Sequence, residues 1–176
     1  MPKLIMSNDY KIKLFEELGI DIVNLVEFNE EIMHITPEDY IKNIITANNV
    51  KGLIVGFNHR FGYKNSGDIE LLKKLSVKYK FELYVIDAVK VNEEVVSSTK
   101  IREYISEGEI VKADRMLTRP YKLSGTVIHG KQNGRKMGFP TANIDYDKNF
   151  VLPKAGVYYT KVKYENKLYK GITNIG

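Results

Sequence analysis

The sequence predicts two modules in series, an α/β module over residues 1–120 and a small antiparallel β module over residues 121–176. The first prediction rests on helical and strand-like segments that alternate along the chain, because strands separated by helices form parallel sheets covered by those helices. The second rests on runs rich in Tyr, Val and Thr after Lys122, with Gly and Asn between them. Pro120 marks the boundary, since the residue before a proline leaves the helical region.

The first two elements are a helix and a strand. Residues 9–19, "DYKIKLFEELG", predict a helix that ends at Gly19, a usual position beyond the last helical turn. Residues 20–28, "IDIVNLVEF", predict a short and mostly apolar strand.

The next helix is marked at its start. Thr36 is expected to cap it, with Pro37 in the first helical position and Asp39 three residues after the cap. Residues 50–56, "VKGLIVG", then predict a strand that is buried on both faces.

The remaining elements of the first module follow the same rules. Residues 67–80 predict a helix and residues 81–86, "FELYVI", a strand. Two further helices, roughly 99–107 and 109–117, are divided by Gly108. The expected inward side chains of the helix at 67–80 are Ile69, Leu72, Leu75 and Tyr79.

The second module is expected to be incomplete. About 55 residues of β structure bury too little apolar surface to be stable alone. The first module also begins with a helix, where such sheets usually begin with a strand and a glycine-rich or histidine-rich turn. We therefore expect sequence beyond both ends of this chain.

The composition limits the class of protein. With 43% hydrophobic and 28% charged residues, the chain suits a soluble globular protein. It contains no apolar run of membrane-spanning length and no secretory signal, so we expect a cytoplasmic protein without a membrane partner. The absence of cysteine excludes disulfides, thiolate zinc sites and a cysteine nucleophile.

Positive charge is concentrated in the last third of the chain. Residues 1–121 carry 17 Lys and Arg against 19 Asp and Glu, whereas residues 122–176 carry 10 against 3. Clustered cations favour an anionic partner such as a nucleotide or a nucleic acid. The alternative is a solvated face of a lysine-rich protein.

The first candidate site is the loop after the strand at 50–56. Ligands of open α/β sheets bind beyond the carboxyl ends of the strands, where this loop must lie. Phe57 and Phe61 can stack on a planar ring, and Asn58 can hydrogen-bond its edge. The alternative is a tight turn closed by aromatic packing.

The second candidate site is "SSTKIR", residues 97–102. A helix N-terminus offers free N–H groups, Ser98 and Thr99 add hydroxyl donors, and Arg102 can fork onto phosphate oxygens. The alternative is a plain Ser/Thr cap on a surface helix.

The third candidate site is "GTVIHGKQNGRKMGFPTANI", residues 125–144, in which glycines alternate with cationic side chains. Thr141 and Asn143 are two apart in an extended segment, so their oxygens can share a magnesium ion bound to phosphates. The alternative is a basic hairpin loop in which Phe139 and Pro140 plug the end of a barrel.

These three stretches, in this order, resemble the bacterial bifunctional riboflavin kinase/FMN adenylyltransferase family, also called FAD synthetase. The resemblance covers essentially the whole chain. It implies a Rossmann-like α/β nucleotidyltransferase domain over residues 1–120, which adenylates FMN to FAD. It also implies a riboflavin kinase β-barrel over residues 121–176, which phosphorylates riboflavin to FMN. Both reactions use ATP with magnesium.

The resemblance also implies roles for particular residues. Ser98, Thr99 and Arg102 match the motif that binds ATP phosphates during adenylyl transfer. Asn58 matches a position near the flavin, whereas His59 stands where an aromatic ring is more usual. In the kinase module, Thr141 and Asn143 match the magnesium and phosphate ligands. The expected ATP-covering loop contributes Gly130, Lys131, Gly134, Arg135 and Gly138.

Two parts of the family pattern have no counterpart here. The histidine motif near the family's N-terminus and the catalytic glutamate of its kinase are both expected to lie outside this chain, so no catalytic residue is identified within it. Glu165 is expected at a strand turn and not in the role of that base. The expected partners are ATP, riboflavin and FMN, without nucleic acid, and the oligomeric state stays open.

Three other functions stay open at this point. The chain can bind flavin or nucleotide without turnover, or it can be a monofunctional nucleotidyltransferase that uses only residues 97–102. It can also be a basic β module that binds RNA, which would show as binding that weakens steeply with salt.

Overall fold

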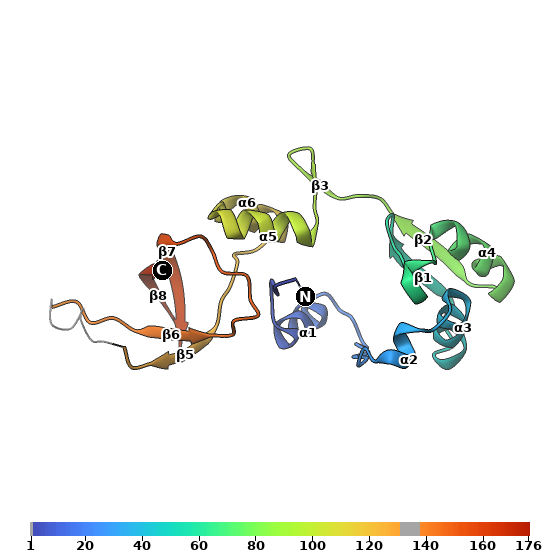
Figure 1. Cartoon of the computed structure of the whole chain (residues 1–176), viewed down its shortest axis with the longest axis horizontal. Helices are drawn as coiled ribbons and strands as arrows, with labels where there is room; N and C mark the ends of the chain where they lie inside the picture. Colours follow the sequence, from blue (N-terminus) through green and yellow to red (C-terminus); the bar gives the residue numbers. More distant parts are fainter. Residues whose placement is uncertain (1, 131–137) are drawn as a thin grey trace. The chain divides into compact units, whose positions relative to one another are not determined.

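The computed structural model describes residues 2–130 and 138–176. They form two compact units. Asn24–Lys90 is here called the central unit, and Met1–Val23 together with Val91–Gly176 is called the composite unit. Figure 1 follows the chain through both.

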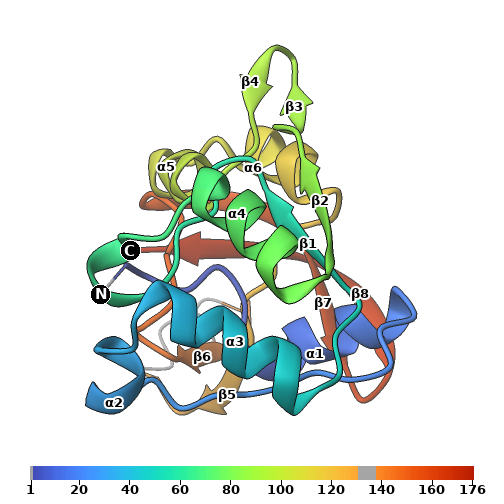
Figure 2. The same cartoon turned by 90° about the vertical axis from the view of Figure 1, so that its right-hand side faces the viewer.

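The central unit is a parallel strand pair with helices beside it. Strand β1 pairs with β2 in parallel from Gly52↔Glu82 to Gly56↔Ile86, which confirms the parallel arrangement that alternating helices and strands predict. Helix α4 runs beside the two strands in both views (Figures 1 and 2). The elements of this unit are α2 (Glu30–Met33), α3 (Pro37–Ala47), β1 (Gly52–Gly56), the 3-10 turn η1 (Tyr63–Asn65), α4 (Ile69–Tyr79) and β2 (Glu82–Ile86).

Local signals begin both long helices of the central unit. Thr36 caps α3, accepting a hydrogen bond from Asp39 N at 3.1 Å and donating one to Asp39 Oδ2 at 2.7 Å, which confirms the predicted cap. Asp68 caps α4 by accepting from Leu71 N at 2.9 Å. The buried core of the unit consists of Ile41, Phe61, Leu72, Leu75 and Phe81.

The prediction that residues 50–56 form a strand buried on both faces is wrong in its second part. Burial alternates along β1, and the Ile54 side chain is 73% exposed. Leu53 and Val55 pack against the core, but no described element covers the face that carries Ile54, Tyr84 and Ile86. A helix layer on one face of a strand pair leaves the other face bare.

The strand predicted at residues 20–28 is also absent. The segment forms no strand among the described residues, and its apolar side chains Ile22 and Phe28 are exposed. An extended segment becomes a strand only by hydrogen-bonding to a partner. This one crosses the junction between the units at Val23 and Asn24 and has no described partner strand.

The helical part of the composite unit agrees with the prediction. Helix α1 (Asn8–Glu17) is capped by Ser7, and α5 (Ser98–Glu107) and α6 (Ile110–Leu117) are divided by Gly108, which has a φ of 83°. That positive φ is the left-handed geometry that glycine adopts freely after a helix. Before α5, β3 (Lys90–Val91) and β4 (Glu94–Val95) form a short hairpin.

Helices α5 and α6 share a core with a residue of the β region. Ile101, Ile105 and Met116 are buried together with Val151. The compact units therefore do not coincide with a division at residue 120. A compact unit reflects contacts within this chain, whereas a domain is a unit of ancestry, and the boundary at residue 120 stays a prediction.

The β region contains two antiparallel pairs. Strand β5 (Gly125–Ile128) pairs with β6 (Asn143–Tyr146), and β7 (Gly156–Tyr164) pairs with β8 (Lys167–Ile175). Glu165 and Asn166 connect β7 to β8 with φ values of 45° and 62°, so Glu165 lies at a strand turn as expected. In the described residues the two pairs are separate sheets, and a closed barrel is not established.

Among the described residues, no helix combines the length and the apolar character needed to cross a bilayer.

Candidate functional site

The first arrangement of interest lies where β5 and β6 stop pairing. The last pair of the ladder is Ile128↔Asn143, and Gly130 lies two residues beyond it. A Cβ at Gly130 would overlap the side-chain amide of Asn143. The amide nitrogen would be the atom nearest to that Cβ, and the amide oxygen would lie farther from it, at 3.3 Å. The backbone of Gly130 therefore lies close beside the Asn143 amide.

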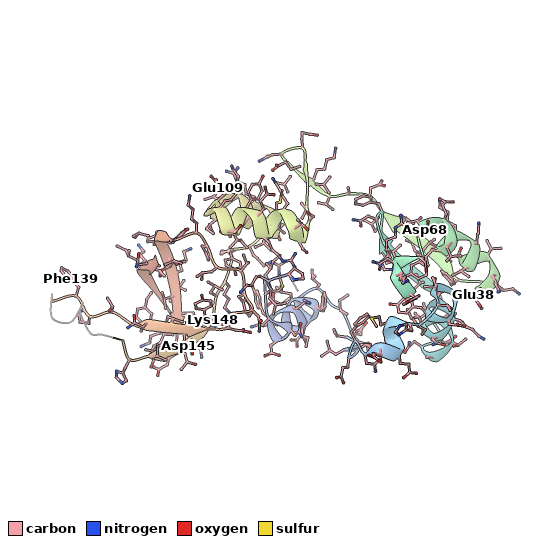
Figure 3. All side chains as sticks on the ribbon, in the orientation of Figure 1. Glu38, Asp68, Glu109, Phe139, Asp145 and Lys148 are labelled. Carbon is pink, nitrogen blue, oxygen red and sulfur yellow. The ribbon has the colours of Figure 1, made fainter. Side chains whose placement is uncertain are left out.

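Thr141 precedes Asn143 by two residues and is exposed, as Asn143 is. Gly138 has a φ of 80°, a conformation that a side chain would strain. Phe139 is 77% exposed and lies well away from Asp145 and Lys148 (Figure 3). The described strand pairs form separate sheets, so the alternative that Phe139 and Pro140 plug the end of a barrel stays open. The predicted ligands Lys131, Gly134 and Arg135 lie outside the described residues.

The oxygen donors at this site suit a magnesium ion. Mg²⁺ takes oxygen ligands and usually keeps several waters while it binds substrate phosphates. The hydroxyl of Thr141 and the side-chain oxygen of Asn143 are donors of that kind. Elsewhere in the described residues, no group of three or more His, Cys, Asp or Glu side chains could hold a metal.

The second arrangement is the N-terminus of α5. Ser97 is the cap and accepts a hydrogen bond from Lys100 N at 3.2 Å. Within residues 2–130 and 138–176, no hydrogen bond engages the main-chain N–H of Ser98 or Thr99. These free N–H groups and the positive end of the helix dipole favour an anion.

Arg102 lies one helical turn after Ser98, so the two side chains are on the same face of α5. Its Nε donates a hydrogen bond to the main-chain oxygen of Lys3 at 2.6 Å. The neighbouring cation is committed elsewhere, because the Lys100 ammonium lies 3.2 Å from Glu103 and 3.8 Å from Glu94. Its hydrogen bond to Glu103 raises the pKa of Lys100 above its usual value.

The third arrangement is the loop after β1 in the central unit. Phe57 N donates to Ile86 O at 2.9 Å, which carries the sheet bonding one residue beyond β1. The side chains of Phe57 and Asn58 are exposed beyond the carboxyl end of the strand, where the sequence placed them.

Phe61 lies elsewhere. Its ring is 5% exposed in the core of the central unit, stacked on His59 at a centroid distance of 5.6 Å. A Cβ at Gly67 would come within 2.7 Å of that ring, so glycine is needed there for the turn to close. For Phe61 the structure therefore favours the alternative of aromatic packing over contact with a ligand.

The predicted residues thus lie in three groups. Two of these groups belong to the composite unit, and the third belongs to the central unit. Ser98, Thr99 and Arg102 lie at the start of one helix, whereas the backbone of Gly130 lies beside Asn143, which belongs to the last pair of the β5–β6 ladder. The contact of Arg102 with Lys3 was missed, because no local pattern signals a hydrogen bond between residues so far apart in sequence.

The described residues thus combine an α/β region, whose helix α5 begins with free N–H groups that favour an anion, with a β region in which Thr141 and Asn143 offer oxygen atoms of the kind that bind magnesium. Comparison with known families makes this specific. The FAD synthetase family model matches residues 1–100 and the riboflavin kinase family model matches residues 117–176. The chain belongs to the FAD synthetase family.

Relatives with a common name cover nearly all of the chain. A protein of Buchnera aphidicola subsp. Schizaphis graminum is 42% identical over 178 residues, which cover 99% of this chain and 57% of the relative. Relatives from Listeria monocytogenes and Bacillus subtilis are 35% and 31% identical, over 94% and 98% of this chain and 52% and 54% of their own lengths. All three are called bifunctional riboflavin kinase/FMN adenylyltransferase. The chain spans about half the length of these relatives.

A solved structure has a similar fold. The crystal structure described as a macrolide-efflux protein from Streptococcus pneumoniae matches with a TM-score of 0.90 at 27% identity, over 98% of this chain and 55% of that one.

Proposed function

We propose that this chain functions in two successive steps of flavin-cofactor synthesis, the phosphorylation of riboflavin to FMN and the adenylylation of FMN to FAD. The observation that carries the proposal is that two regions matching the two families in succession each contain an arrangement suited to phosphate. ATP is the proposed donor of the phosphoryl group in the first step and of the adenylyl group in the second. The proposed location is the cytoplasm.

In the adenylylation step, Ser98, Thr99 and Arg102 bind phosphate groups of ATP. A phosphate oxygen of FMN attacks the α-phosphorus of ATP, and pyrophosphate leaves. This chemistry needs positioning and charge neutralisation more than a covalent intermediate. The free N–H groups of α5 and the Arg102 guanidinium supply both.

The flavin of this step lies at the loop after β1. Asn58 offers an amide to the edge of the ring system, and Phe57 offers an exposed aromatic face. Phe61 supports the loop from the core and is not a direct ligand in this proposal.

In the phosphorylation step, Thr141 and Asn143 would hold magnesium bound to ATP, and the glycine-rich loop that includes Gly130 and Gly138 would cover the nucleotide. The magnesium ion, when bound, neutralises charge on the phosphates that the reaction transfers. The close approach of the Gly130 backbone to the Asn143 amide supports this role for Asn143.

The finer fold assignment belongs to the same proposal. We assign residues 1–120 to a Rossmann-like nucleotidyltransferase domain and residues 121–176 to a riboflavin kinase barrel. The parallel β1–β2 pair supports the first assignment, and the antiparallel pairs β5–β6 and β7–β8 support the second.

The test incubates the purified chain with riboflavin or FMN, ATP and magnesium, and separates the flavins by chromatography. A parallel titration follows flavin fluorescence to measure binding. FMN formed from riboflavin and FAD formed from FMN would support the proposal. Flavin binding without either product would favour the alternative of binding without turnover, and the absence of binding and turnover would contradict the proposal.

A further inference from the structure

We propose that residues 2–5 form a strap that positions the Arg102 guanidinium for the phosphate groups of ATP. The inference rests on the proposed function, because Arg102 belongs to the anion site at the start of α5. The strap acts through its backbone, with the oxygen of Lys3 as the contacting atom.

The strap is held by the β region of the composite unit. Leu4 N donates to Asn149 O at 2.7 Å, and Val151 N donates to Leu4 O at 2.9 Å. These two bonds make a parallel bridge between Leu4 and Phe150. The main-chain N–H and C=O of Leu4 are therefore both hydrogen-bonded, which fixes the path of the strap.

Two side chains of the strap add to this attachment. Ile5 packs against the core that contains Ile101 and Val151. The Lys3 ammonium donates to the main-chain oxygen of Lys148. The strap thus lies between α5 and residues 148–151, and its backbone cannot shift without breaking contacts on both sides.

Among the described residues, Lys3 is the only hydrogen-bonding partner of the Arg102 side chain, so the two terminal nitrogens of its guanidinium stay free. A guanidinium has five N–H donors in a rigid plane, and the bond from Nε uses one of them. The four N–H groups on the two terminal nitrogens can still fork onto a phosphate end-on. Fixing the plane in advance reduces the entropy that is lost when the anion binds.

The strap also connects regions that match different families. Residues 149–151 lie in the part that matches riboflavin kinase, whereas residues 3 and 4 lie in the part that matches FAD synthetase. Arg102 lies two residues beyond the FAD synthetase match. The kinase region therefore supports the phosphate site of the adenylylation step through a backbone path that no sequence motif marks.

The test is a double-mutant cycle with Leu4→Pro and Arg102→Ala. Proline at residue 4 removes the N–H that bonds Asn149 O, while Leu4→Ala keeps it and serves as the conservative variant. ATP with magnesium is titrated into each variant of the full chain. Binding is read from the NMR signals of the Ser98 and Thr99 amides, so that ATP bound in the kinase region does not enter the measurement.

If the strap positions Arg102, Leu4→Pro should weaken ATP binding at these amides by about three- to tenfold, whereas Leu4→Ala should bind ATP as the wild-type chain does. In the Arg102→Ala background, Leu4→Pro should cause no further loss, because the strap acts only through Arg102. Equal losses in both backgrounds would overturn the inference. If the wild-type chain binds no ATP at these amides, the proposed function fails first and the strap has no role in it.

A second measurement covers the case that Leu4→Pro does not fold. In the wild-type chain without nucleotide, the Arg102 Nε–H should exchange slowly with solvent, and it should stay protected when ATP is added. Rapid exchange of this proton in the folded wild-type chain would overturn the inference.

Discussion

The side-chain amide of Asn143 occupies the space that any side chain at residue 130 would need. Gly130 follows β5 and Asn143 begins β6, so the contact forms only when the β5–β6 ladder is in register. The close approach places the backbone of Gly130 beside the amide of a proposed magnesium ligand, so that a larger residue 130 would have to displace that amide.

Gly130→Ala should therefore displace the Asn143 amide. We expect kinase turnover to fall by on the order of 100-fold, because small misplacements of positioning groups cost that much. The measurement is the rate of FMN formation from riboflavin. Gly156→Ala is the matched control, since a Cβ there meets its nearest neighbour at an ordinary 3.7 Å. Equal effects of the two changes would contradict the proposed role of the contact.

Thr141→Ala should lower FMN formation and leave FAD formation largely intact, because Thr141 is a proposed ligand of the kinase region only. FMN formation from riboflavin and FAD formation from FMN are measured for this variant.

Arg102→Ala should lower FAD formation by roughly 10- to 100-fold, the effect of losing a charge-assisted hydrogen bond. This variant and Thr141→Ala together should therefore separate the two reactions. Both rates are measured by flavin chromatography on each variant, and equal loss of both activities in either one would count against two separate sites.

The central unit should lose stability in acid through Glu38. This carboxylate on α3 accepts hydrogen bonds from Lys78 and Tyr79 on α4, and these lower the pKa of Glu38 below its ordinary value of 4.5. A lowered folded-state pKa stabilises the fold above the unfolded pKa, and that stabilisation disappears as the pH falls through the folded value. Thermal unfolding should therefore shift to lower temperature as the pH falls below about 4.5.

Glu38→Gln should reduce this dependence on pH, as measured by hydrogen exchange of α3 and α4. Glu70→Gln is the control, because the ion pair of Glu70 with Lys73 is exposed and lies within a single helix. If the two variants have the same pH profile, the contact between α3 and α4 is not the source of the effect.

The two units should respond separately to cavities in their cores. Leu72 in the central unit and Ile105 in the composite unit are both fully buried. Replacing either one by Ala should cost about 2 to 5 kcal/mol of unfolding free energy. Hydrogen exchange should accelerate in residues 37–86 for Leu72→Ala and in residues 98–117 for Ile105→Ala. Acceleration of both segments in both variants would show that the units unfold as one.

The elements that the sequence predicted well are those with local causes. The α3 cap at Thr36 and the break at Gly108 depend on residues within one turn, and both are present. The strand at 20–28 failed because its formation depends on a partner that no local pattern supplies. The exposed Ile54 has the same cause, since an apolar run does not show which face a helix covers.

The candidate site divides in the same way. The residue types at Ser98, Thr99 and Asn143 could be chosen from their motifs, and α5 does begin where its motif predicts. The Gly130–Asn143 contact depends on strand register, and the burial of Phe61 depends on how the loop closes on Gly67. The bond between Lys3 and Arg102 depends on the tertiary fold alone.

The bridge between Leu4 and Phe150 also affects the order in which parts of this fold can form during synthesis on the ribosome. The β7–β8 hairpin is closed by a two-residue turn and can form within microseconds of its own synthesis. Leu4, in contrast, is synthesised 146 residues before Phe150, so the bridge between them can form only after residue 150 has emerged. Arg102 therefore acquires its Lys3 contact late, and a nascent chain halted before residue 150 should carry the α5 motif without the support that orients it.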